Sequence, residues 1–215
     1  MSQPNWQFKI FRACARALFQ LVFRVRVIGL EHVPHTPYIV CVNHLGWAEG
    51  FLVMLWFPPA PLLHGLGERD VMERSQFRRW FFRQIPIFLP LDRDKPRQAV
   101  RLMEDVLKRG GALGIAPEGQ LGKQEGALGE LQNGAAYLSL RTGAPLVPVG
   151  ATGTRELWLR KTLTLRVGEP IAPQNFTGDT RALTAQLEKD MRALLPGDAQ
   201  APRWKPLRNF LTKLF

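Results

Sequence analysis

The stretch Cys41–Gly50, Cys-Val-Asn-His-Leu-Gly-Trp-Ala-Glu-Gly, continues an apolar run that begins at Tyr38 and has the length of a buried strand. The run is followed by an imidazole, His44, and five positions later by a carboxylate, Glu49. Residues five apart on a regular helix lie about 140° apart around its axis. The two side chains therefore meet only if His44 lies in a strand-to-helix turn and Glu49 in the first helical turn. Turns of this kind are where α/β proteins commonly place chemistry.

The two residues have two interpretations. In the first, Glu49 accepts a hydrogen bond from one ring nitrogen of His44 and fixes its tautomer, while the other nitrogen takes a proton from a hydroxyl. In the second, His44 caps a helix and Glu49 lies on a solvated face. One histidine and one glutamate are a weak signal by themselves, so both interpretations stay open at this point.

Length and composition indicate one globular domain. The 215 residues are enough for a substantial core and too few for two full domains, and 46% of them are hydrophobic and 22% charged. Cys14 and Cys41 lie in apolar surroundings without the spacing of a disulfide framework or a metal site. We expect both thiols to be reduced, as in the cytosol.

The net charge of +11 belongs to the two ends of the chain. Residues 1–30 and 201–215 together carry nine Lys and Arg and no acid, which leaves 20 basic against 18 acidic residues between them. Large apolar residues separate these charges, a pattern typical of helices at a lipid interface and unlike a nucleic-acid-binding arm. We predict an amphipathic membrane-interface helix over residues 1–24 and a basic amphipathic tail over 199–215. The alternative is that residues 7–23 form a helix packed on the domain.

Neither end is a candidate for crossing a membrane. Both lack the roughly 18 uninterrupted apolar residues that a spanning helix needs. Arginines also interrupt the apolar part of the N-terminus, which argues against a secretory signal peptide. We therefore expect a peripheral protein on the cytoplasmic face of the cell membrane, with membrane lipids as partners and no nucleic acid.

Short apolar runs alternate with helical patterns between the two ends. Strands are expected near residues 23–28, 38–42, 62–66, 85–91, 112–116, 145–149 and 163–167, and helices near 5–23, 51–57, 70–83, 96–110, 130–141 and 180–195. This alternation predicts a single α/β domain over residues 25–198, with a mixed sheet flanked by helices.

Several common catalytic signatures are absent from the sequence. It contains no P-loop, no complete dinucleotide-binding fingerprint and no Gly-x-Ser-x-Gly elbow. The four histidines are not spaced as a zinc site, so no metal centre is expected.

Four stretches, in the same order, resemble motifs of the glycerolipid acyltransferases, the 1-acylglycerol-3-phosphate acyltransferase family. They are Asn43–Glu49, Ile87–Asp94, Ala116–Gly119 and Leu146–Val149. The first resembles Asn-His-x4-Asp, the second a strand followed by arginine, and the third Pro-Glu-Gly-Thr-Arg. The resemblance covers about residues 25–170 and implies the α/β fold of that family.

The resemblance implies an O-acyltransferase of phospholipid biosynthesis. A fatty acyl group would move from an acyl thioester, on coenzyme A or acyl carrier protein, to the hydroxyl of a lysophospholipid such as 1-acylglycerol-3-phosphate. By position, His44 would be the general base and Glu49 its orienting partner, while Arg93, Glu118 and Gly119 would bind the acceptor. No resident cofactor is implied.

Two positions depart from the family pattern. Glu49 stands where the family has aspartate, which keeps the charge and adds a methylene. Gln120 and Leu121 replace the Thr-Arg of the third motif, which removes a cation from the expected phosphate site, and Lys123 is the expected substitute. Two alternatives follow: an acyltransferase for a lipid acceptor without a phosphate, and a catalytically inactive lipid-binding membrane protein. Nothing in the sequence specifies an oligomeric state.

Overall fold

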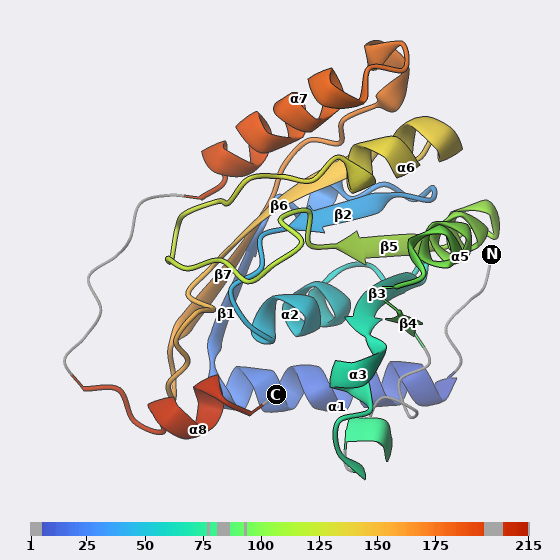
Figure 1. The fold of residues 1–215 in the computed structure, drawn as a ribbon. Coiled ribbons are helices and arrows are strands. Elements are labelled where there is room, and N and C mark those ends of the chain that lie inside the picture. Colours follow the sequence, from blue (N-terminus) through green and yellow to red (C-terminus); the bar gives the residue numbers. More distant parts are fainter. Residues whose placement is uncertain (1–5, 77, 81–86, 93, 196–203, 215) are drawn as a thin grey trace.

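The computed structural model (Figure 1) describes residues 6–76, 78–80, 87–92, 94–195 and 204–214. The strands are β1 (Arg24–Ile28), β2 (Ile39–Val42), β3 (Leu63–Glu68), β4 (Phe88–Leu91), β5 (Ala112–Ile115), β6 (Leu146–Thr152) and β7 (Thr162–Val167). The helices are α1 (Trp6–Val22), α2 (Ala48–Trp56), α3 (Arg69–Met72), α5 (Pro96–Lys108), α6 (Gly134–Thr142), α7 (Thr180–Ala193) and α8 (Arg208–Thr212), with 3-10 helices η1 (Leu30–His32) and η2 (Pro173–Phe176).

The seven strands form one mixed sheet in the order β1-β7-β6-β2-β5-β3-β4. The central strand, β2, pairs in parallel with β6 on one side and with β5 on the other. β6 and β7 are antiparallel, and β7 pairs in parallel with β1. The prediction of one α/β domain with a mixed sheet is confirmed. Because β6, β2 and β5 are neighbours and parallel, the segments that follow them meet at one edge of the sheet.

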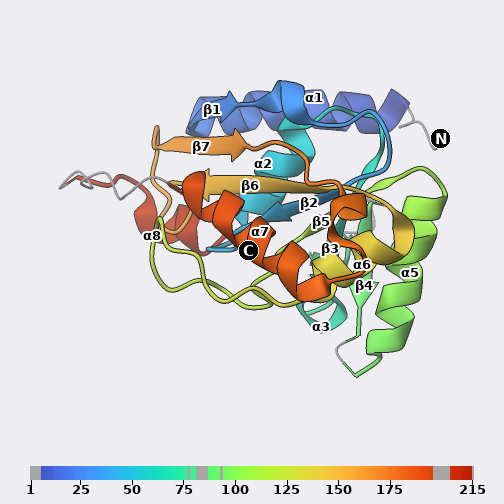
Figure 2. The ribbon, with the colours of Figure 1, turned by 90° about the horizontal axis from the view of Figure 1, so that it is seen from above.

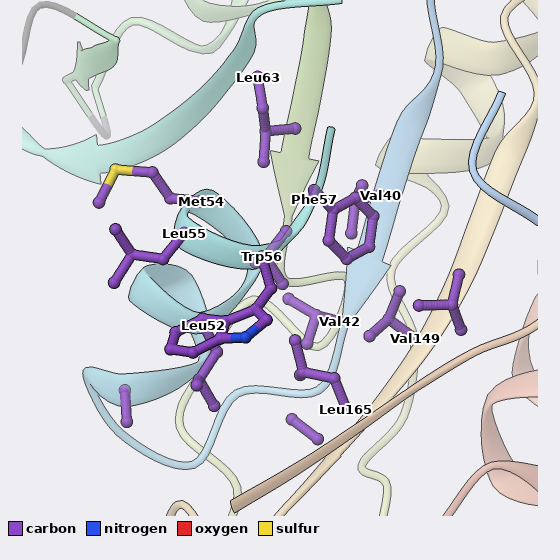
Figure 3. Close-up of a cluster of buried hydrophobic side chains, with 14 of the residues drawn as sticks. Val40, Val42, Leu52, Met54, Leu55, Trp56, Phe57, Leu63, Val149 and Leu165 are labelled. Atoms are coloured by element: carbon purple, nitrogen blue, oxygen red, sulfur yellow. The ribbon is translucent and has the colours of Figure 1, made fainter. Parts of the chain in front are cut away.

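The burial of β2 on both faces explains the layers of the fold. Successive side chains of a strand point to opposite faces, so Val40 and Val42 belong to one apolar cluster and Ile39 and Cys41 to another. Side chains of α2 gather over Val40 and Val42 (Figure 3), and α1 covers the same cluster. Helices α5, α6 and α7 cover the second cluster on the opposite face (Figures 1 and 2).

The helix boundaries differ from the predictions at three places. α2 begins at Ala48 rather than residue 51, which places Glu49 in its first turn, as the pattern required. α6 begins at Gly134, because residues 130–133 continue the preceding loop. α3 ends at Met72, and bends at residues 73–75 interrupt the helix predicted to run on to residue 83. Residues 77 and 81–83 of that prediction lie outside the described part of the chain.

α1 packs one apolar face on the domain and exposes another. Phe11 and Phe19 contact the cluster that α2 and β2 form. Large apolar side chains on its other face are exposed: Trp6, Ile10, Leu18 and Leu21. The predicted helix is present, and it also packs on the domain, as the alternative required.

Arg12 joins α1 to the C-terminal end of α2. Its Nε donates to the Leu55 carbonyl at 3.0 Å, and its Nη2 donates to the Phe57 carbonyl. The last carbonyls of a helix have no partner within the helix, so Arg12 supplies donors that α2 lacks. Burial lowers the pKa of the Arg12 guanidinium, and the charge of Arg16 adds to this effect.

Arg12→Met keeps the length of the side chain and removes both hydrogen bonds. We expect it to lower the free energy of unfolding by about 2 kcal/mol, because half-buried carbonyls lose charged donors. Equilibrium denaturation in urea measures the change. Lys9→Met, on the exposed side of the same helix, is the control and should change the same quantity by less than about 0.5 kcal/mol. Equal losses in the two variants would contradict the capping role.

Candidate active site

Asn43 extends the pairing of β2 with β6 beyond the last strand residue. Its Nδ2 donates to the Ala151 carbonyl at 3.0 Å, and its Oδ1 accepts from the Ala151 N–H at 2.7 Å. The side chain is fully buried. These two bonds stand in for the backbone ladder and let the main chain turn away at His44. The sequence analysis named Asn43 only as part of a motif, and its place directly after a central strand is the signal of this role.

His44 lies in the connection between β2 and α2, as predicted, and is half-buried. Its main chain is held on both sides. Its N–H donates to Glu118 Oε1 at 3.1 Å, and its carbonyl accepts from the Gly122 N–H at 2.6 Å. Both partners belong to the loop after β5, the strand beside β2. The imidazole is thus carried on a fixed turn at the edge where β6, β2 and β5 end.

Glu49 is completely buried, with 0% of its surface exposed, so the interpretation that placed it on a solvated face is wrong. Oε1 accepts from the Leu45 N–H at 2.9 Å and from Thr154 Oγ1 at 2.5 Å. Oε2 accepts from the Gly46 N–H at 3.2 Å. Within the described ranges there is no hydrogen bond between Glu49 and the ring of His44, so that expectation is also wrong. The longer side chain instead reaches back to N–H groups of the connection that precedes α2.

Glu118 is also buried, at 3% exposure, and both of its oxygens are engaged. The oxygen that does not bond His44 accepts from the Gly129 N–H at 2.9 Å. A Cβ at position 129 would lie only 2.7 Å from that oxygen, so a side chain there would have to displace the carboxylate. Gly119 follows with φ of 66°, in the left-handed region that favours glycine. Glu118 thus holds His44 in place, and acceptor binding by Glu118 and Gly119 stays a prediction.

Two cations, Arg93 and Lys123, were predicted at the acceptor phosphate. Lys123 is exposed on the loop after β5 and has no hydrogen-bond or ion-pair partner among the described residues. Arg93 lies outside the described residues. An open hollow of about 540 Å³ lies at the start of α5, and neither His44 nor Glu49 lines it. Its lining residues are Asp94, Lys95, Pro96, Arg97, Gln98 and Arg101.

The chemistry available at this edge is that of the His44 imidazole, and the thiol of Cys41 in the strand before it is not suited to act as a nucleophile. Burial raises the pKa of the Cys41 thiol well above its usual range, and Cys41 belongs to the cluster under α6 and α7. Within residues 6–76, 78–80, 87–92, 94–195 and 204–214, no group of three or more His, Cys, Asp or Glu side chains is placed to hold a metal ion. A half-exposed histidine on a rigid turn is suited to take a proton from a hydroxyl.

Sequence reasoning missed the loop after β6. Thr154 is buried and bonds Glu49, while the N–H groups of Gly153 and Arg155 donate to the two oxygens of Glu125 at 2.7 and 3.2 Å. The only signal in the sequence is that this loop follows directly after the strand predicted at residues 145–149. The donors to Glu49 therefore come from two segments that are far apart in the chain, and Glu125 connects the second of them to the loop after β5.

The comparisons with known proteins agree with this architecture. The Acyltransferase family model matches residues 24–152, more than half of the chain. A 1-acyl-sn-glycerol-3-phosphate acyltransferase of Bacillus subtilis is 26% identical over 213 residues, covering 95% of this chain and 100% of that one. The enzyme of the same name from Saccharomyces cerevisiae is 27% identical over 178 residues, covering 77% of this chain and 57% of its own length. The crystal structure of the 1-acyl-sn-glycerophosphate acyltransferase PlsC from Thermotoga maritima superposes with a TM-score of 0.70 at 22% identity, over 86% of this chain and 77% of that one, and so shares the fold.

The fold and the four ordered motifs define an acyltransferase-like α/β protein. The chain belongs to the Acyltransferase family, and the resemblance to glycerolipid acyltransferases is confirmed. It spans the whole of the bacterial relative and 57% of the yeast one.

Gly129→Ala tests the arrangement of Glu118 and His44. We expect at least tenfold less activity, because the new methyl group displaces the carboxylate that holds the His44 N–H and leaves that buried N–H without its partner. Gly134→Ala is the control, since a Cβ there meets nothing within 4 Å. It should leave activity unchanged and stabilise α6 slightly. Initial rates and thermal unfolding are measured for both variants. Unchanged rates for Gly129→Ala would contradict the conclusion that Glu118 holds His44 in its working position.

Proposed function

We propose that this protein is an O-acyltransferase of phospholipid biosynthesis that transfers a fatty acyl group from an acyl thioester to the free hydroxyl of 1-acylglycerol-3-phosphate. The observation that carries the proposal is the placement of His44 on a doubly anchored turn at the end of β2, in a chain of the Acyltransferase family. The names of the relatives supply the class of acceptor.

In this mechanism His44 is the general base. Its free ring nitrogen takes the proton of the acceptor hydroxyl as the oxygen attacks the thioester carbonyl. The tetrahedral intermediate then collapses to the new ester and expels the thiolate of coenzyme A or acyl carrier protein, which takes up the proton. No acyl-enzyme is formed and no resident cofactor is needed, in keeping with the neutral, buried thiol of Cys41. Glu49 supports the imidazole through the main chain of its turn.

Arg93 and Lys123 would receive the acceptor phosphate. Lys123 is the next residue after Gly122, whose N–H binds the His44 carbonyl, and this proximity along the chain supports its assignment to the acceptor site. Its exposed ammonium has no protein partner among the described residues, which leaves it available to a phosphate. Glu118 and Gly119 would shape the approach to the site from the same loop.

Leu121 favours a second candidate, acyl transfer to a lipid acceptor without a phosphate. It stands where the family pattern has a cation and is 58% exposed. A third candidate is a lipid-binding protein without activity. It has the same fold, and the comparison of wild type with His44→Ala described below distinguishes it from an enzyme.

The exposed apolar residues at both ends would dock the protein on the cytoplasmic face of the membrane. α1 and α8 lie along the same side of the molecule (Figure 1). The loop before β7 is bonded to the chain at both helices: the Arg160 N–H donates to the Val22 carbonyl at the end of α1, and the Leu159 N–H donates to the Pro206 carbonyl just before α8. The C-terminal segment exposes Trp204, Leu207, Phe210 and Leu214. Among the helices of the described residues, none has the length and apolar character needed to cross a bilayer.

His44→Ala tests the reaction. Purified wild type should release thiol from acyl-coenzyme A or acyl carrier protein only when 1-acylglycerol-3-phosphate vesicles are present, and the variant should lose at least a hundredfold in rate, as expected for a general base. A matching acceptor without the phosphate distinguishes the second candidate. Equal rates for wild type and variant with every donor and acceptor would exclude the mechanism and favour the lipid-binding protein.

A double substitution, Trp204→Ala with Phe210→Ala, tests the docking surface. Each aromatic side chain buried in lipid contributes about 2 kcal/mol, so binding to vesicles that contain anionic phospholipid should fall more than tenfold in a sedimentation assay. Leu102→Ala, also an exposed apolar side chain, lies on α5 at the other end of the molecule (Figures 1 and 2) and should bind as wild type does. Unchanged binding by the double variant would rule out this surface.

A further inference from the structure

Thr154 lies beyond the last residue that the family model matches, yet its side chain reaches the carboxylate at the centre of the site. It is 1% exposed, and its hydroxyl donates to Glu49 Oε1 at 2.5 Å, a distance typical of a hydroxyl donating to a carboxylate. The other two donors to Glu49 are main-chain N–H groups. Among the described residues, Thr154 is the one side chain that bonds this buried carboxylate.

The bonds of Glu49 fix the main chain immediately after His44. Its two oxygens hold the consecutive N–H groups of Leu45 and Gly46. Glu118 holds the N–H of His44 itself. A glutamate side chain has more rotamers than an aspartate and more entropy to lose on ordering. A third donor, arriving from the loop after β6, restricts it to the conformation that holds both N–H groups.

Thr154 is itself held in place from both sides. The N–H groups of Gly153 and Arg155 donate to Glu125, and Gly153 has φ of 88°, which directs the chain sharply after β6. The threonine hydroxyl is therefore presented to Glu49 by a loop with little freedom of its own.

We propose that Thr154 is a positioning residue that acts on His44 through Glu49 and the N–H groups of residues 45 and 46. The inference rests on the proposed function, since it assigns a role in acyl transfer to a residue outside the four motifs. Supporting shells of this kind hold a catalytic group within a fraction of an ångström of its working geometry, and small displacements of a catalytic group lower rates steeply.

The test compares Thr154→Val, which removes the hydroxyl at nearly constant volume, with Thr154→Ser, which keeps it. We expect Thr154→Val to lower kcat about tenfold, the effect of losing one hydrogen bond to a charged group, with KM for donor and acceptor within about twofold. Thr154→Ser should restore most of kcat. A wild-type kcat in Thr154→Val, or an equal loss in Thr154→Ser, would overturn the inference.

Thr142→Val is the matched control. It also removes a threonine hydroxyl at nearly constant volume, but that hydroxyl bonds the Leu138 carbonyl and the Ala144 N–H at the end of α6 rather than Glu49. We expect its kcat to stay within about twofold of wild type. If it loses as much kcat as Thr154→Val, the loss of any such hydroxyl accounts for the effect and the specific role of Thr154 is refuted.

Amide hydrogen exchange gives a reading that does not depend on activity. The N–H groups of residues 45 and 46 should exchange at least tenfold faster in Thr154→Val than in wild type, and at the wild-type rate in Thr154→Ser. Unchanged exchange in Thr154→Val would overturn the inference even if acyl transfer is established. The N–H groups could also exchange faster in Thr154→Val although the wild type shows no acyl transfer that depends on His44. In that case the proposed function is wrong, and the link from Thr154 to residues 45 and 46 stands.

Discussion

The rest of the site depends on two buried carboxylates whose oxygens accept hydrogen bonds from backbone N–H groups. Burying a charge is costly unless it is paired or well hydrogen-bonded, and Glu49 and Glu118 meet this cost with N–H groups of consecutive residues, 44 to 46. Successive N–H groups that converge on an anion form a concave nest. The turn that carries His44 is therefore fixed by charge burial rather than by the apolar packing that orders the strands beneath it.

The order of the strands makes this arrangement possible. Because β6, β2 and β5 are adjacent and parallel, the loops that follow them lie side by side, although they are separated by about 30 to 110 positions in the chain. Thr154, His44 and Glu118 each come from one of these loops. The apolar alternation of β2, with Val40 and Val42 on one face and Ile39 and Cys41 on the other, fixes the central strand and hence where the three loops meet.

The sequence was sufficient for features that depend on local pattern. Apolar runs located all seven strands, and the spacing of His44 and Glu49 correctly placed one in a turn and the other in the first turn of a helix. Spacing did not reveal which donors the buried carboxylate of Glu49 would find, because the fold brings Leu45, Gly46 and Thr154 to it together. The role of Thr154 could not be predicted for the same reason, since its contact with Glu49 spans 105 positions. The start of α6 was misplaced because loop residues there are fixed by contacts across the fold.

A hydrogen bond connects the proposed membrane surface to the turn that carries His44. The indole N–H of Trp47, in the turn between His44 and Glu49, donates to the Leu211 carbonyl of α8 at 3.0 Å. Leu211 is buried in the cluster that α1 and α2 share, so α8 is anchored while its neighbours remain exposed. A lipid acceptor bound at this surface would keep its acyl chain in the bilayer and present only its polar end, which avoids a cost of about 0.8 kcal/mol per methylene brought into water. Because the turn and α8 are bonded directly, the proposed docking of the helix would set the height of His44 above the lipid.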